Sequence, residues 1–540
     1  MSERYMETAV KMGKASATGG FHLFIGKIIS TIIYGIGSIL VGMFIDPADY
    51  GLYTIALVPV ATFILFQDWG IGSSLTKYCA NYRAEKREKE LRSIIVSGLT
   101  FMATTGIVLT LLSLLTTNLV ASIFGYPESA FLLTIVSFTI LSNAILNCSL
   151  NVFVGFERME LITVTMIVAA TVQGMLSPLL VYLGFGAVGA VVGFTVASVI
   201  SSVASLALLY FSIFRRLPLG NMKKPKMFQT LKPLLVYGVP LSIAAIIGGI
   251  TSQIILFVMA SSTDIAMIAS FGIARGFTIF LTFFTSPIKT VLFPAFSKLD
   301  PLRDRHILKT VFASSVKYSS LFMVPAIVAI MVLSTPLIST IYADKWVSAP
   351  FFLTILIMNE LVVLLGTLSC SRLLTAIGET KLLMKLNLLS LCIGAPTAFL
   401  VIPPLGILGV VITTTVTGIP SLIIGLYWTW KHYEAKADLY NSAKIFLAAA
   451  ITGVITYMFL TLANTASWIL LIAGATVFLV VYILSISLVG AVNQMDIDNL
   501  RVMFSELGLI SKLLRILLTL IEKIIKVKDK RSNVQDSQRP

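Results

Sequence analysis

The sequence is poor in charged residues. Of its 540 residues only 12% are Asp, Glu, Lys or Arg, whereas 57% are hydrophobic, and the mean hydropathy is +0.94. An ordinary soluble domain carries about 25% charged residues. So few charges cannot cover the surface of a water-soluble protein, which excludes a soluble fold and predicts that the bilayer is the solvent of this chain.

Cysteine and histidine are also scarce. The four cysteines and three histidines are scattered, and none of them forms a Cys-x-x-Cys pair or shares metal-ligand spacing. This pattern predicts buried, small apolar cysteines and no disulfide, metal site or cofactor. The N-terminus lacks the features of a signal peptide, because residues 1–20 are polar and no cleavage site follows a short apolar run. We therefore expect the first helix to be retained.

Long apolar runs fill most of the chain. A membrane-spanning helix needs about 20 mostly apolar residues, and reading for such runs gives about fourteen candidates. They lie at residues 20–45, 50–75, 93–117, 129–151, 161–183, 187–214, 233–260, 266–292, 311–335, 351–370, 382–402, 405–430, 443–462 and 467–489. The sequence therefore predicts an all-α polytopic membrane protein.

The positive charges fix the orientation of these spans. The net charge is +15, and the Lys and Arg residues gather in the loops that follow even-numbered spans. Examples are Lys86, Arg87, Arg215, Arg216 and Arg303. By the positive-inside rule these loops and both termini are cytoplasmic, in a multi-pass protein of the cell (plasma) membrane. Basic residues spread in this way do not predict nucleic-acid binding, which uses a basic patch on a soluble fold.

The two halves of the sequence resemble each other at an offset of about 220 residues. Residues 186–191 (Gly-Ala-Val-Gly-Ala-Val) match residues 406–411 (Gly-Ile-Leu-Gly-Val-Val), and two further matches occur in the same order. An offset of six spans leaves both copies in the same orientation, which predicts parallel six-helix bundles around a central cleft.

This repeat predicts the domain organisation. We expect an N-terminal bundle at 1–214, a basic cytoplasmic linker at 215–232, a C-terminal bundle at 233–430 and two additional spans at 443–490. Residues 491–540 are expected to be cytoplasmic, with an amphipathic helix at 508–528 and a disordered polar tail. That helix suits the membrane interface, and docking of a partner such as a glycan-assembly protein is the alternative.

Several short motifs resemble the polysaccharide flippase family. They are Asp-Pro-x-x-Tyr-Gly-Leu-Tyr at 46–53, Asp-Trp-Gly-Ile-Gly at 68–72, Gly-Phe-Glu-Arg at 155–158, Phe-Pro-Ala-Phe-Ser at 293–297 and Ala-Ile-Gly-Glu-Thr-Lys at 376–381. This family belongs to the multidrug/oligosaccharidyl-lipid/polysaccharide exporter superfamily. The resemblance implies transfer of lipid-diphosphate-linked oligosaccharide from the cytoplasmic to the outer leaflet by alternating access.

Two other functions stay open at this point. Relatives in the superfamily export drugs or small solutes with an ion gradient, and they usually have fewer spans. The sequence gives less support to a membrane glycan polymerase or glycosyltransferase. The outer loops are short, and we find no nucleotide, metal or paired-carboxylate motif in the inner loops. We therefore expect a transporter, with membrane lipids around it, and no catalytic residues.

Cations inside apolar spans are candidates for binding an anionic substrate. A central Arg costs about 2.5–3.5 kcal/mol on insertion scales, so it should face a cavity or a partner. Arg275 lies well inside the span 266–292 and suits a diphosphate, because guanidinium donates paired hydrogen bonds. A structural salt bridge is its alternative. Lys27 would add a second charge, although it lies near enough to the membrane surface to reach the lipid headgroups.

The intramembrane acids and amides complete the candidate set. Glu360 could bind a coupling H+ or Na+, or it could pair with Arg275. Asp68 is a candidate for the same ion, or for a cap or hinge. Asn143 and Asn147 share one helix face and could contact glycan hydroxyls, with hydrogen bonding between helices as the alternative.

Overall fold

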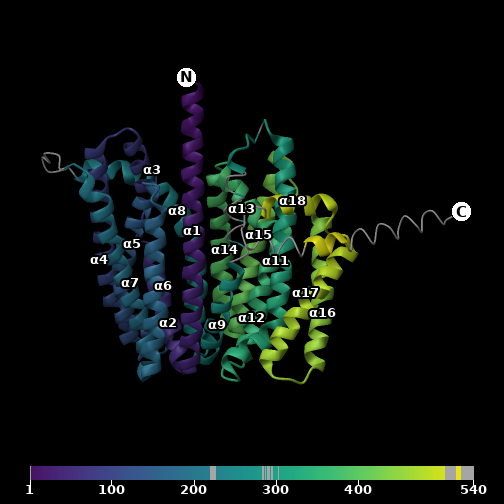
Figure 1. Cartoon of the computed structure of the whole chain (residues 1–540). Coiled ribbons are helices and arrows are strands. Elements are labelled where there is room, and N and C mark those ends of the chain that lie inside the picture. Colours follow the sequence, from purple (N-terminus) through teal and green to yellow (C-terminus); the bar gives the residue numbers. More distant parts are fainter. Residues whose placement is uncertain are drawn as a thin grey trace. The chain divides into compact units, whose positions relative to one another are not determined.

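A computed structural model describes residues 2–218, 227–282, 285, 288, 292, 296–301, 303–504 and 518–523, with side chains from residue 23 onward except at 227 and 502–504. Most of these residues are helical, and no strand occurs among them (Figure 1). The predicted all-α fold is therefore confirmed.

The chain forms two compact units, which are described separately. Unit 1 comprises Met1–Gly276 and Met384–Gly418, and unit 2 comprises Phe277–Leu383 and Ile419–Pro540. These boundaries differ from the predicted limits at residues 214, 232 and 430, and the division into two six-helix bundles stays a prediction. The helices of the first stretch are α1 (Ser2–Phe44), α2 (Pro47–Leu65), α3 (Ile71–Ala84), α4 (Glu88–Phe124), α5 (Ser129–Gly155), α6 (Met159–Leu180), η1 (Val181–Phe185), α7 (Gly186–Ser212), η2 (Phe214–Arg216), α8 (Met227–Ser262) and α9 (Ile265–Phe277).

The remaining helices begin after residue 304. They are α11 (Arg305–Tyr342), α12 (Ala349–Met358), η3 (Asn359–Leu365), α13 (Thr367–Ala376), α14 (Thr380–Leu405), α15 (Ile407–Tyr433), α16 (Leu439–Leu462), α17 (Ser467–Val489) and α18 (Gln494–Phe504). The middle of α14 and the first part of α15 belong to unit 1.

Twelve helical segments of the described residues are long and apolar enough to cross a membrane, or thirteen with one bent pair counted as a span. The chain is thus a multi-pass membrane protein. One of the twelve segments, Met159–Arg216, has 58 residues and contains both α6 and α7, which pack against each other. Gly184 separates them with a left-handed φ of 90°. Counting the bent pair as a span and α6 and α7 as separate spans would give fourteen. The predicted number of fourteen spans stays a prediction.

Several helices are longer than the apolar runs from which they were predicted. Helices α4 and α11 have 37 and 38 residues, so each is about 55 Å long at 1.5 Å per residue. The hydrocarbon core is only about 30 Å thick. Hydropathy marks the part of a helix that lipid surrounds, whereas Lys, Arg and Glu continue the same helix into water because they are good helix formers.

Small residues bring the helices of unit 1 together. A Cβ on Gly37 of α1 would lie 2.5 Å from the Cα of Gly174 in α6, so no side chain fits between these two helices. Such close approach is the usual basis of helix association in lipid, where apolar burial gives no driving force. Buried Ile94, Val152 and Leu75 add a core shared by α3, α4 and α5.

Two predicted spans are broken, which corrects the expectation of continuous helices at 50–75 and 351–370. The first break lies between α2 and α3, where Trp69 and Gly70 have φ values of 48° and 75°. The second lies between η3 and α13, where Gly366 has φ 90° and the axes bend by 58°. Hydropathy does not detect such breaks, because the residues around them are as apolar as a helix interior.

Local geometry accords with the predicted repeat. After α5, the N–H groups of Glu157 and Arg158 donate to the carbonyls of Val154 and Phe153. After α13, Gly378 and Glu379 donate to Thr375 and Leu374 in the same pattern. Gly186 and Gly406, at the start of the two matching helices, have φ values of 50° and 54°. These helix-ending turns lie about 220 residues apart, as the sequence matches do.

Some expectations fall on residues that are not described. Much of the linker at 215–232, most of the amphipathic helix at 508–528, the tail after it and most of the motif at 293–297 lie outside the described residues.

Candidate functional site

Arg275 occupies the last turn of α9, and its side chain is exposed at the protein surface. Glycines on both sides of it hold α9 against its neighbours. A Cβ on Gly272 would lie 2.8 Å from the ring of Tyr50 in α2, and one on Gly276 would lie 3.7 Å from the Ser38 hydroxyl in α1. This packing positions the end of α9, which carries Arg275, within unit 1.

Lys27 is also exposed, and it lies on α1. Eleven positions separate it from Ser38, the residue of α1 that Gly276 approaches. Those positions correspond to about 16 Å along the helix axis. Lys27 and Arg275 therefore lie at different depths of unit 1, and they form two separate positive positions instead of one clamp.

The first helix break contains Asp68. Its Oδ1 accepts a hydrogen bond of 2.7 Å from the N–H of Gly72, one of the first amides of α3 that have no partner within the helix. The structure thus gives Asp68 the capping contact that the sequence left as an alternative to ion binding. Ion binding by Asp68 stays a prediction.

Backbone contact between two glycines closes this break against α8. A Cβ on Gly70 would lie 2.0 Å from the carbonyl oxygen of Gly238. Beside it, the buried hydroxyl of Ser74 donates to the carbonyl of Leu234 over 2.7 Å. Unwound backbone is tolerated at membrane depth where protein covers it, and this break is such a case.

Asn143 and Asn147 take part in the same closure. Asn143 Oδ1 accepts from Nε2 of the buried Gln67 and from Nδ2 of Asn147, both over 2.6 Å. This network joins the α2–α3 break to α5. Asn143 thus bonds to a distant segment, while its bond with Asn147 lies within α5. Contact with a glycan stays a prediction.

Glu360 lies at the second break, on the 3₁₀ segment η3 of unit 2. The chain turns at Gly366, and the hydroxyl of Thr367 donates to the carbonyl of Val362 over 2.6 Å. That bond satisfies one carbonyl which the break removes from regular helix. Glu360 and Arg275 belong to different units, so their pairing stays a hypothesis.

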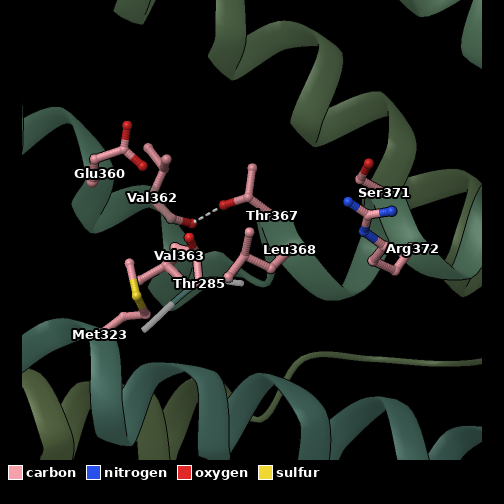
Figure 2. Close-up of a pocket in the computed structure, with 9 residues that line it drawn as sticks. All are labelled: Thr285, Met323, Glu360, Val362, Val363, Thr367, Leu368, Ser371 and Arg372. Carbon is pink, nitrogen blue, oxygen red and sulfur yellow. Dashed lines mark hydrogen bonds between the residues drawn. The ribbon is translucent and has the colours of Figure 1, made fainter. Parts of the chain in front are cut away.

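A cavity of about 290 Å³ opens at this second break. Figure 2 shows Glu360 and Arg372 at opposite sides of it, with the hydroxyl of Thr367 between them. Thr285 and Ser371 add two more hydroxyls. The apolar part of the lining consists of Met323, Val362, Val363 and Leu368. This combination offers one carboxylate, one guanidinium and three hydroxyls to whatever enters.

Arg372 is a functional candidate that the sequence analysis missed. The predicted tenth span ended at Cys370, whereas α13 continues to Ala376 and carries Arg372 on it. Within the part of the chain that the structure describes, Arg372 makes no hydrogen bond or ion pair. A spacing of twelve residues from Glu360 could have suggested the pair only if the break at Gly366 had been known.

A second missed feature is an ion pair with a structural role. Lys317 in α11 donates to Asp496 in α18 over 2.6 Å, and the two side chains are only 12% and 8% exposed. Asp496 also accepts from the backbone N–H of Asn493, whose side chain accepts from the N–H of Asp496 in return. The ion pair holds α18 against α11 within unit 2.

The described residues contain no group of three or more His, Cys, Asp or Glu side chains that could hold a metal ion. Cys79, Cys148 and Cys370 are buried with free thiols, and Cys392 is free and exposed. Of the predicted residues, the structure joins Asn143 to Asn147 and places Glu360 on a cavity. It does not join Lys27 to Arg275.

The fold and these sites define a helical membrane protein with broken spans and exposed intramembrane charge. Residues 16–300 match the family described as "Polysaccharide biosynthesis protein". The chain belongs to that family, and the predicted place in the multidrug/oligosaccharidyl-lipid/polysaccharide exporter superfamily is confirmed.

One curated relative is the lipopolysaccharide biosynthesis protein WzxC of Escherichia coli (strain K12). It is 23% identical over 337 residues, which cover 59% of this chain and 62% of the relative. The match thus spans less than two thirds of that relative's length.

Two solved structures have a similar fold. The lipid II flippase MurJ, in an inward closed conformation, matches with a TM-score of 0.70 and 17% identity over 86% of this chain and 98% of its own. An inward-facing multidrug resistance MATE family transporter of the MOP superfamily matches with a TM-score of 0.63 and 17% identity, over 75% and 94%. At this identity the likeness concerns the fold alone.

Proposed function

We propose that this protein is a flippase which moves lipid-diphosphate-linked oligosaccharide from the cytoplasmic to the outer leaflet of the plasma membrane by alternating access. The observation that carries the proposal is the exposed guanidinium of Arg275 on the apolar helix α9, in a chain of the polysaccharide biosynthesis family. A guanidinium suits a diphosphate because it donates paired hydrogen bonds.

Lys27 has a supporting role in this proposal. Because it lies about 16 Å of helix away from the level of Arg275, it would meet the diphosphate at another stage of the path instead of sharing it with Arg275. With both termini in the cytoplasm, α1 begins on that side, and Lys27 lies nearer to it than Ser38 does. Lys27 would therefore attract the substrate before Arg275 binds it.

Of the two predicted acids, Glu360 is the better placed to meet a ligand. Asp68 accepts the N–H of Gly72 and suits a gating hinge, whereas Glu360 lines a cavity. Binding of a coupling H+ or Na+ by either acid stays a prediction. The proposal assigns the protein no catalytic step, and it leaves glycan-assembly proteins as partners of the cytoplasmic C-terminal segment.

The test is depletion of the protein in its native cell, followed by measurement of diphosphate-linked glycans in each leaflet. We expect complete glycolipids to accumulate on the cytoplasmic side. Wild-type protein should restore transfer, and Arg275→Ala should lower the rate by about tenfold or more, since a charged hydrogen bond contributes about 1.5–3 kcal/mol. Arg275→Lys should retain part of the rate because it keeps the charge.

Arg303→Ala is the matched control, because it removes an Arg whose side chain is 89% exposed at the end of a loop. It should transfer glycolipid at the wild-type rate. Unchanged glycolipids after depletion would contradict the proposal. New sensitivity to cationic compounds would then favour the ion-coupled exporter of drugs or small solutes.

A further inference from the structure

The cavity at the second break carries both signs of charge. Glu360 contributes a carboxylate from η3, and Arg372 contributes a guanidinium from α13, on opposite sides of the same space (Figure 2). Three hydroxyls, of Thr285, Thr367 and Ser371, lie on the lining as well. Since all these residues belong to unit 2, the cavity is a property of that unit alone.

A bare coupling cation does not suit this lining. A cation drawn to Glu360 would share a space of about 290 Å³ with the positive charge of Arg372. Like charges within one cavity repel each other. A phosphate drawn to Arg372 meets the converse problem, because the carboxylate of Glu360 lines the same cavity.

A neutral ligand with many hydroxyls can form hydrogen bonds with both charged groups. Each hydroxyl of a sugar can donate to a carboxylate and accept from a guanidinium, so the pair of opposite charges would hold one sugar ring without excess charge. Hydrogen bonds to charged groups are also stronger than bonds between neutral groups. The apolar lining by Met323, Val363 and Leu368 would cover the C–H face of the ring.

The size of the cavity fits this ligand class. Small-molecule pockets commonly range from about 300 to 1,000 Å³, so a space of about 290 Å³ holds a ligand of one ring and excludes a long glycan. The helix break is what creates the space. Gly366, with φ 90°, turns α13 away from η3, and Thr367 satisfies the carbonyl of Val362.

We propose that this cavity is a subsite for one sugar unit of the transported glycan, held between Glu360 and Arg372. The inference rests on the proposed function, which supplies the glycan. It assigns Glu360 to substrate recognition in place of cation coupling, and it adds Arg372 as the second recognition residue.

Thiol protection tests the subsite directly. Ser371→Cys places an exposed thiol on the lining, in a Cys392→Ser background that removes the exposed native thiol. The purified full chain in detergent would be treated with a maleimide, and the labelling rate measured. Thr461→Cys, exposed at the end of α16 in the same unit, is the matched control.

The probes would be the diphosphate-linked glycolipid fraction extracted from the native membrane, the same fraction after mild acid has removed its glycan, and NaCl. We expect the intact glycolipid to slow labelling of Ser371→Cys about tenfold, and the other two probes to leave it unchanged. Labelling of Thr461→Cys should not respond to any probe. Equal protection by the deglycosylated fraction, or protection by NaCl, would overturn the sugar assignment.

A separate binding measurement distinguishes the sugar subsite from the flippase proposal. Mass spectrometry of the detergent-solubilised complex would measure binding of the intact glycolipid to the whole protein. Binding without protection of Ser371→Cys would overturn the subsite and leave the flippase proposal standing. No binding at all would overturn both. Arg372→Ala and Glu360→Ala should each weaken binding about tenfold, whereas Glu360→Gln should weaken it less, because an amide still bonds to hydroxyls.

Discussion

The two broken spans of this protein solve the same problem in different ways. Between α2 and α3 the protein fills the break with its own groups, namely Gly238, Asn143 and the capping carboxylate of Asp68. Between η3 and α13 the break borders a cavity of about 290 Å³ with Glu360 and Arg372 on its lining. Irregular backbone in a membrane must either be covered by protein or line a cavity, and this chain uses both solutions.

The difference separates structural from functional charge. Asp68 lies beside an amide that it caps, so its removal should affect folding first. Arg372 has no partner among the described residues, so its removal should affect ligand binding first. Polar residues inside spans are therefore informative only after their partners are known.

The largest expected effect comes from filling the glycine contact at the first break. Gly70→Ala would place a Cβ 2.0 Å from the Gly238 carbonyl and force a non-glycine residue to φ 75°. We expect unit 1 to lose about 3 kcal/mol of stability, or the protein to fail to accumulate. Thermal unfolding in detergent would measure it. Gly125→Ala is the control, because Gly125 has φ 76° with nothing within 4 Å, so only about 1 kcal/mol should be lost.

A smaller loss of stability is expected from the amide network. Asn143→Leu removes the oxygen that accepts from both Gln67 and Asn147, and Gln67 is 1% exposed. Leaving a buried donor without a partner should cost about 2 kcal/mol. Combining it with Gln67→Leu should cost less than the sum of the two changes, since both partners are then apolar. Fully additive losses would show that the network does not join the α2–α3 break to α5.

At the second break we expect a substitution to impair transport and to leave stability nearly unchanged. Arg372→Ala should slow glycolipid transfer about tenfold, equivalent to about 1.4 kcal/mol, and leave the unfolding temperature of the protein nearly unchanged. Parallel transfer and unfolding assays would measure both, with Arg303→Ala as a control for lost positive charge. A stability loss as large as that of Asn143→Leu would remove the distinction between the two breaks.

The smallest effect should come from an exposed ion-pair network outside both breaks. Lys309 donates a hydrogen bond to the carboxylate of Glu434, and Arg305 lies 3.3 Å from the same carboxylate. The hydrogen bond from Lys309 is the main cause that lowers the pKa of the Glu434 carboxyl below 4.5. A lowered pKa contributes stability that is present above 4.5 and is lost as the pH falls through the lowered value. Wild type should therefore unfold at a slightly higher temperature than Glu434→Gln at pH 7, and the two should converge in acid. High salt should shrink the difference at pH 7.

Composition and charge pattern were enough to predict the helical membrane fold, and the resemblance of short motifs indicated the family. Apolar runs and loop charges depend on contact with lipid and water, which each segment meets independently of its neighbours, so these features can be read along the chain. Arg275, Lys27, Asp68 and Glu360 could likewise be singled out, because an ionisable residue in an apolar run is costly wherever the run packs.

What surrounds such residues was shown only by the tertiary structure. The breaks at Gly70 and Gly366 depend on φ angles that neighbouring helices impose, and no feature of the apolar runs foretells them. Asn143 was read as a glycan contact or a packing residue, and its partner Gln67 lies 76 positions away. Arg372 comes to line a cavity with Glu360 because the helix axes before and after Gly366 are bent by 58° to each other. A hydrogen-bond partner or a cavity is a relation between distant segments, and packing creates it.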